Sequence, residues 1–141
     1  MVKGILLSPT GEPKIVDVKK DYRDVKRLLE IESPVTLVER CIGGKYFDLW
    51  IDDEGLFKQE KDGTILACGV CDNAQEILAG KILIVNHNGD EMASLTYQDM
   101  NLICENLKRI NRDFVTVTYE TNIGVLNMKF VKEGAILKYS V

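Results

Sequence analysis

Hydrophobic and polar residues alternate in changing patterns along the first part of the chain, and these patterns predict its first elements. An apolar run over 2–8 and an alternating stretch over 14–18 are typical of strands. Proline and glycine in 9–13 predict a hairpin turn between them. Apolar residues at helical spacing then predict a helix over 21–31, which ends there because the residue before Pro34 disfavours helical backbone.

A second hairpin is predicted in the middle of the chain. Residues 35–42 and 46–51 have the pattern of two strands, and Gly43 and Gly44 between them can adopt the positive φ angles of a tight turn. Beyond the turn at 52–55, shorter apolar runs predict further strands, at 56–57, 64–67 and 81–85.

Two polar segments flank the last of these strands. Residues 73–80 are typical of a short helix that glycine stops at Gly80. The run 86–90 is rich in asparagine and glycine and predicts a turn. That turn contains His87, the only histidine of the chain, so we expect it to be an ordinary turn residue.

The second long helix is marked by its first turn. Thr96 and Asp99 have the spacing of a capping box, with aspartate in place of the usual glutamate. The apolar stripe that follows predicts a helix to about Asn111. Residues 113–141 then contain three short stretches of β-forming residues, a C-terminal β extension that either joins the main sheet or forms a dimer edge.

Hairpins mixed with helices, without regular βαβ alternation, predict an α+β fold. We expect a mainly antiparallel sheet with two longer helices and one short helix. The 141 residues suit one domain over 1–141.

Net charge and the length of the apolar runs argue against several functional classes. A formal net charge of -4 argues against general binding to nucleic acid, which requires a basic face. No apolar run is long enough for a membrane span or a secretory signal, so we expect no membrane partner and a cytoplasmic location. The four cysteines are then expected to be free thiols.

The sequence does not supply the groups of a known enzyme. The chain has one histidine, the side chain on which acid–base and nucleophilic catalysis most often depend. No phosphate-binding glycine motif is present. Cys68 and Cys71 have the spacing of a redox or metal pair, but neither a thioredoxin context nor a second pair of ligands accompanies them. We therefore expect a non-enzymatic protein with no cofactor and no metal, and buried structural cysteines are the alternative to a thiol site.

Three features fit ligand binding, each beside a purely structural interpretation. Tyr46, Asp48 and Trp50 share one face of a strand, so the rings either stack on a ligand or partner or cover the core. Basic residues near the end of the second long helix either bind a phosphate group or complement the helix dipole. Backbone donors in glycine and asparagine turns could hold an anion. The candidate binding residues are Gly43, Gly44, Tyr46, Trp50, Asn73, Arg109 and Arg112.

Several short motifs occur in the order found in a known family: Ile42-Gly43-Gly44, Asp52-Asp53-Glu54-Gly55-Leu56, Asn73-Ala74, Ala79-Gly80-Lys81-Ile82-Leu83-Ile84-Val85 and Leu95-Thr96. From Val38 to Asp99 the chain resembles the domain-of-unknown-function family three-eight-four-six, small proteins found mainly in phages and mobile elements. The resemblance transfers no catalytic residues. It implies a phage-type accessory protein that acts by occupancy, in the cytoplasm of the host cell.

Three functions follow as hypotheses. The first is a binding protein that sequesters a small nucleotide-like ligand, such as a cyclic nucleotide immune signal, and so counters host defence. The second is an inhibitor that docks on a host protein through the aromatic strand face or a sheet edge. The third is a thiol or metal protein that uses Cys68 and Cys71. A homo-oligomer formed through a sheet edge is compatible with each.

Overall fold

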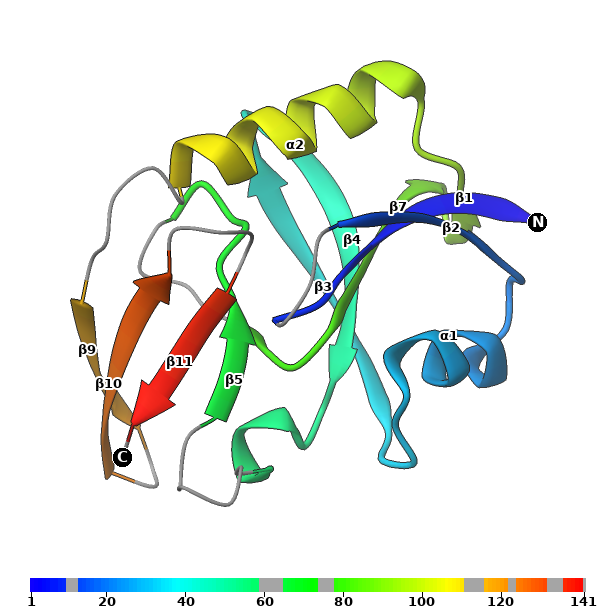
Figure 1. Ribbon diagram of the computed structural model, residues 1–141. Coiled ribbons are helices and arrows are strands. Elements are labelled where there is room, and N and C mark those ends of the chain that lie inside the picture. The colour runs from blue at the N-terminus through cyan, green and yellow to red at the C-terminus, as the bar shows by residue number, and fades with distance from the viewer. Residues whose placement is uncertain are drawn as a thin grey trace.

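The computed structural model describes residues 1–9, 13–58, 65–73, 78–110, 116–121, 124–131 and 136–140. These residues form two antiparallel sheets and two α-helices (Figure 1), which agrees with the α+β prediction. The elements are β1 (Val2–Leu7), β2 (Lys14–Val18), α1 (Tyr22–Leu29), β3 (Val35–Ile42), β4 (Lys45–Asp52), the 3-10 helix η1 (Gly55–Phe57), β5 (Ile65–Cys68), β6 (Leu78–Ala79), β7 (Ile82–Asn88), β8 (Glu91–Ala93), α2 (Tyr97–Ile110), β9 (Thr116–Thr121), β10 (Gly124–Val131) and β11 (Ile136–Ser140).

The larger sheet has the strand order β2-β1-β7-β4-β3, with β8 paired to β7. Its central strand, β7, begins with Ile82, Leu83, Ile84 and Val85, all of which are fully buried. Because neighbouring residues of a strand point to opposite faces, this continuous apolar run means that both faces of the sheet are covered at its centre. The predicted strand over 81–85 is therefore the middle of the sheet.

Helix α1 covers one face of this sheet and lies within the predicted range 21–31. Asp21 caps the N-terminus by accepting a hydrogen bond from the backbone N–H of Asp24, and Glu30 ends the helix in the left-handed conformation, at φ 56°. Val25 and Leu29 pack with residues of β1, β2 and β7 in one hydrophobic cluster. We call this side of the sheet the α1 face.

Helix α2 lies on the opposite face, where Ile103 and Leu107 pack against Phe47 and Leu49 of β4. Its N-terminus has the predicted capping box. The backbone N–H of Thr96 donates to Oδ2 of Asp99 at 2.9 Å, and the backbone N–H of Asp99 donates to Oγ1 of Thr96 at 3.1 Å. The shorter aspartate therefore fulfils the role usually taken by glutamate.

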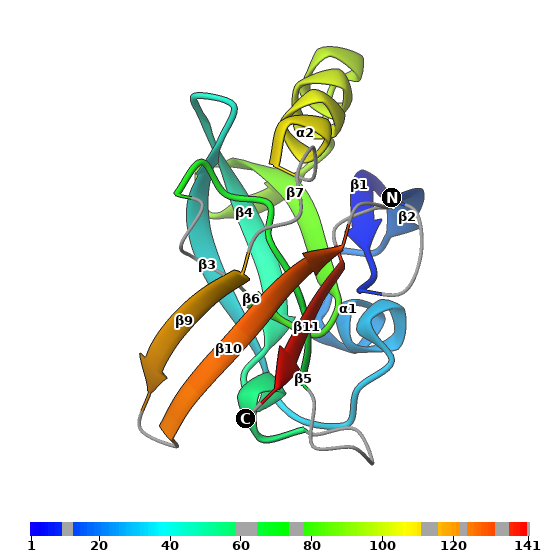
Figure 2. The ribbon, with the colours of Figure 1, turned by 60° about the vertical axis from the view of Figure 1, so that its left-hand side comes forward.

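The C-terminal strands belong to a second sheet, with the order β6-β5-β11-β10-β9. Figures 1 and 2 show it on the same side of the larger sheet as α2 and away from α1. Cys68, Val70 and Leu78 beside β5 and β6 join the same buried cluster as α2. The predicted extension over 113–141 thus pairs with β5 and does not lengthen the larger sheet.

Three local predictions differ from the structure. Leu56 and Phe57 belong to η1 and not to a strand. Leu78 and Ala79 form β6, paired with β5, so the predicted short helix does not reach Gly80; residues 74–77 lie outside the described part of the chain. His87 lies in β7, because pairing with β8 extends that strand to Asn88. Long-range strand pairing overrode a local helix preference at 78–79 and a local turn preference at His87.

Candidate functional site

Part of the α1 face is left uncovered near the edge strand β3. Tyr46 is 60% exposed and Leu37 is 45% exposed, and Glu39 and His87 are also exposed. Strand pairing places them together: Leu37 lies opposite Trp50, Cys41 opposite Tyr46, and Glu39 opposite Asp48. We name the residues Leu37, Glu39, Tyr46, Asp48 and His87 the open patch.

Trp50 and Tyr46 share a face of β4, as their alternation predicts, but their surroundings differ. Trp50 is half-buried and contacts Tyr22 of α1 edge to face, with ring centroids 5.5 Å apart. Tyr46, four residues earlier on the same strand, is 60% exposed. One ring thus covers the core, and the other is available to a ligand.

A groove of about 380 Å³ adjoins the patch at Trp50. Tyr22, Val25, Trp50 and Met92 form its apolar walls, and its charged residues are Lys20, Asp21, Asp90 and Glu91. Lys20 lies 3.4 Å from Glu91, so the single positive charge of the groove is already paired. The groove is therefore aromatic and acidic.

Three side chains of the open patch form a cluster of metal-ligand type. The ligand atoms of Glu39, Asp48 and His87 all lie within 4.8 Å of one another. Nδ1 of His87 is 3.0 Å from Oδ1 of Asp48. Each residue comes from a different strand, namely β3, β4 and β7, so the sheet fixes their spacing.

The candidate backbone donors of Gly43 and Gly44 are engaged inside the chain. Both glycines have the positive φ angles predicted for the hairpin turn. Their N–H groups donate to Oδ1 and Oδ2 of Asp72, at 2.6 and 2.8 Å. The turn does form an anion-binding nest, and the anion that it holds is the chain's own Asp72 carboxylate.

The remaining candidates are Asn73, Arg109 and Arg112. Asn73 is exposed beside Asp72, next to the β3–β4 hairpin. Arg109 has its backbone in α2, but its side chain lies outside the described part of the structure, as does the whole of Arg112.

The environment of Cys68 and Cys71 favours a structural role. Both side chains are buried in the cluster beneath α2. Burial raises the pKa of the Cys68 thiol far above its ordinary value, whereas a redox thiol requires a lowered pKa. The Sγ of Cys68 lies 3.5 Å from the carbonyl oxygen of Gly80, to which it can donate. This arrangement fits an inert thiol.

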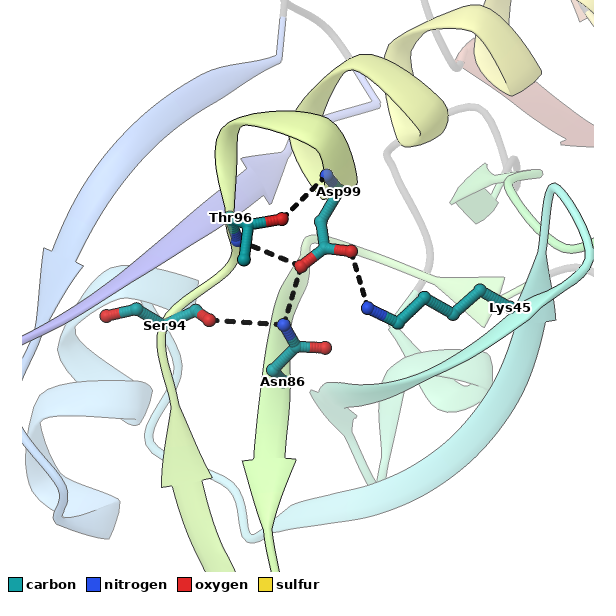
Figure 3. A network of polar contacts seen from close by, with 5 residues as sticks. All are labelled: Lys45, Asn86, Ser94, Thr96 and Asp99. Carbon is teal, nitrogen blue, oxygen red and sulfur yellow. Dashed lines mark hydrogen bonds and ion pairs between the residues drawn. The ribbon is translucent and has the colours of Figure 1, made fainter.

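A separate polar network surrounds Asp99 at the start of α2 (Figure 3). Its carboxylate contacts Lys45 Nζ at 2.6 Å and accepts from Asn86 Nδ2 at 2.7 Å, in addition to the capping bond. Burial raises the pKa of Asp99, but the hydrogen bonds from Lys45, Thr96 and Asn86 outweigh it and lower the pKa to about 2. Because these hydrogen bonds satisfy both oxygens, the network anchors the helix to the sheet.

The sequence patterns missed most of the open patch. Asp48 was noticed only as a neighbour of the two rings, His87 was assigned to a turn, and Leu37 and Glu39 were seen only as strand residues. One clue was present: the tight Gly43-Gly44 turn fixes the hairpin register and so places Glu39 opposite Asp48. The partner strand β7, which brings His87, could not be inferred in this way.

Comparison with known proteins gives a family but no function. No curated protein and no solved structure matches the chain. Among the described residues, no helix is long and apolar enough to cross a membrane. The family model described as "Domain of unknown function (DUF3846)" matches residues 2–108, which extends the resemblance beyond 38–99 and leaves β9, β10 and β11 outside it. The chain therefore belongs to the DUF3846 family.

Proposed function

We propose that the protein is a non-enzymatic binding protein that docks a basic segment of another protein on the open patch and the adjoining groove. The observation that carries this proposal is the combination of exposed aromatic rings with exposed acidic groups. Tyr46 and Tyr22 are 60% and 66% exposed. Asp21 and Asp90 line the groove beside Trp50.

Aromatic rings next to carboxylates suit lysine and arginine side chains. A guanidinium or ammonium group is attracted to the face of a tryptophan or tyrosine ring, and its N–H groups donate to nearby carboxylates. Tyr22 and Trp50 already lie at a T-shaped angle of 80°, so part of each ring is held rigidly in place. A rigid aromatic anchor loses little entropy on binding, which is typical of interface hot spots.

The same charges disfavour the nucleotide hypothesis at this place. A cyclic nucleotide is an anion, and the groove has three acidic residues against one lysine, which is paired. The backbone donors suggested for an anion, at Gly43 and Gly44, are bound to Asp72. An anionic ligand would have to displace that carboxylate. The protein-docking hypothesis needs no such rearrangement.

The chain's single tryptophan permits a direct test. Trp50 fluorescence is recorded while arginine-rich peptides, acidic peptides of equal length and cyclic nucleotides are added in turn. We expect a saturable change only with basic peptides. The outcome that contradicts the proposal is saturation by a nucleotide, or no response to any basic peptide.

Two tyrosine variants locate the surface. Tyr46→Ala should weaken basic-peptide binding by about tenfold, the loss expected for an aromatic hot spot worth somewhat more than 1 kcal/mol. Tyr97→Ala is the matched control, because Tyr97 is 79% exposed at the start of α2, away from the α1 face. Equal losses in both variants would place the binding surface elsewhere.

A further inference from the structure

The strongest unassigned feature is the trio of side chains on neighbouring strands of the larger sheet. Glu39 on β3 lies directly opposite Asp48 on β4. Asp48 lies opposite Val85 on β7, and His87 follows two residues later on the same face. Their ligand atoms lie within 4.8 Å of one another.

The placement of the two acids is unfavourable without a cation. Like charges directly opposite one another on antiparallel strands destabilise the pairing, because their side chains are close. Here the neighbour that contacts Asp48 is an imidazole, whose Nδ1 lies 3.0 Å from Oδ1. A divalent ion between the three groups would neutralise both carboxylates and accept the imidazole lone pair.

We propose that Glu39, Asp48 and His87 form a binding site for a divalent transition-metal ion, with Zn²⁺ as the best match. One nitrogen and two oxygen ligands fit zinc, whereas calcium and magnesium prefer oxygen ligands alone and more of them. Ligands of a tetrahedral zinc ion with bonds of about 2.0–2.2 Å lie roughly 3.3 Å apart. Nδ1 and Oδ1 now share a hydrogen bond of 3.0 Å, so binding the ion would replace the proton between them and move the two atoms apart by about 0.3 Å. The carboxylate of Glu39 lies within 4.8 Å of both atoms and is exposed, so its side chain has room to move closer.

Three protein ligands leave a fourth position, which faces solvent because Glu39 and His87 are exposed. Such an open position accepts water or a donor atom of a bound partner. The site lies next to Tyr46, on the surface proposed for docking, so a partner carboxylate or imidazole could complete the coordination. The metal site itself stands on the ligand geometry and does not depend on that docking.

The test uses tag-free protein that has been treated with a chelator, because a polyhistidine tag would bind the same ions. Calorimetric titration with Zn²⁺ should show one ion bound per chain. Replacement by Co²⁺ should give the visible absorption of a tetrahedral ion without the near-ultraviolet band of thiolate ligands. His87 is the only histidine, so broadening of its ring signals by Co²⁺ identifies it directly in NMR spectra.

Variants decide between this site and others. His87→Ala and Glu39→Gln should each weaken Zn²⁺ binding by about tenfold or more, since even outer-sphere partners are commonly worth 10- to 100-fold. Glu105→Gln, which changes an exposed carboxylate on α2 at the opposite face of the sheet, should leave the affinity unchanged. The absence of saturable binding, binding unaffected by His87→Ala, or a thiolate band with Co²⁺ would each overturn the proposal. Circular dichroism of each variant verifies that the fold is kept.

Discussion

Lys45 and Asp99 are joined by an ion pair of 2.6 Å that ties the start of β4 to the first turn of α2 (Figure 3). The Asp99 side chain is only 5% exposed, and the Lys45 side chain is 50% exposed. The carboxylate therefore depends on its neighbours for the interactions that water would otherwise supply. Asn86 and Thr96 provide them from β7 and from the helix cap.

This network makes stability depend on pH in the acid range. The pKa of Asp99 is lowered from 3.8 to about 2, so the native state holds this carboxylate ionised more strongly than the unfolded chain does. The resulting stability is present above about pH 4 and is lost as the pH falls towards 2; the shift corresponds to about 2 kcal/mol. Urea unfolding at several pH values should show a decline in this range that is shallower in Asp99→Asn. Asp53→Asn, at an exposed turn position, is the control.

Some acid dependence should persist in Asp99→Asn. The pKa of Asp24 is also lowered, chiefly by its hydrogen bond from Arg27. The pKa of Asp52 is raised by burial but lowered overall by its hydrogen bonds from Lys58, Ser33 and Glu54. If the pH profiles of the wild type and Asp99→Asn coincide, the carboxylate is not stabilised as described.

The hydrogen bonds from the β3–β4 turn to the Asp72 carboxylate give a second prediction. Asp72→Ala removes the acceptor of two backbone N–H groups and should reduce the free energy of unfolding by about 2 kcal/mol. A hydrogen bond to a charged acceptor is worth about 1.5–3 kcal/mol. The loss for the two bonds together is expected to be smaller than their sum because water can reach the exposed donors. Asp72→Asn keeps one acceptor oxygen and should lose roughly half as much. Denaturant titration measures both, with exposed Asp90→Ala as the control. Equal stability of Asp72→Ala and the wild type would contradict this role.

The two glycines of that turn should differ in their tolerance of a side chain. Both have positive φ, so alanine at either position costs about 1–2 kcal/mol in backbone strain. A Cβ at Gly43 would also lie 2.6 Å from Cδ1 of Leu102 on α2, whereas a Cβ at Gly44 would meet nothing within 4 Å. Gly43→Ala should therefore be more destabilising than Gly44→Ala by about 1 kcal/mol or more.

A double-mutant cycle tests the cause of that difference. Leu102→Ala removes the atoms that would collide, so the extra cost of Gly43→Ala should shrink in this background. If the losses in the free energy of unfolding are additive in thermal or denaturant unfolding, a Cβ at Gly43 does not collide with Leu102.

Much of the local structure could be predicted from the sequence because its determinants are close together in the chain. Asp21 caps α1, Thr96 and Asp99 form the capping box of α2, and Gly43 and Gly44 make the tight turn. Each depends on backbone geometry within a few residues. The antiparallel α+β class followed from the same signals.

The candidate site, in contrast, was decided by contacts between distant segments. The period of a strand shows which residues share a face, as for Tyr46 and Trp50, but it does not name the neighbouring strand or the register. Pairing of β7 with β4 and β8 moved His87 from a predicted turn to the side of Asp48. Likewise, a carboxylate 29 residues away filled the nest at Gly43. Sequence alone determined the elements and their caps, and tertiary packing determined which polar groups stayed available, because it brings in partners that no local pattern encodes.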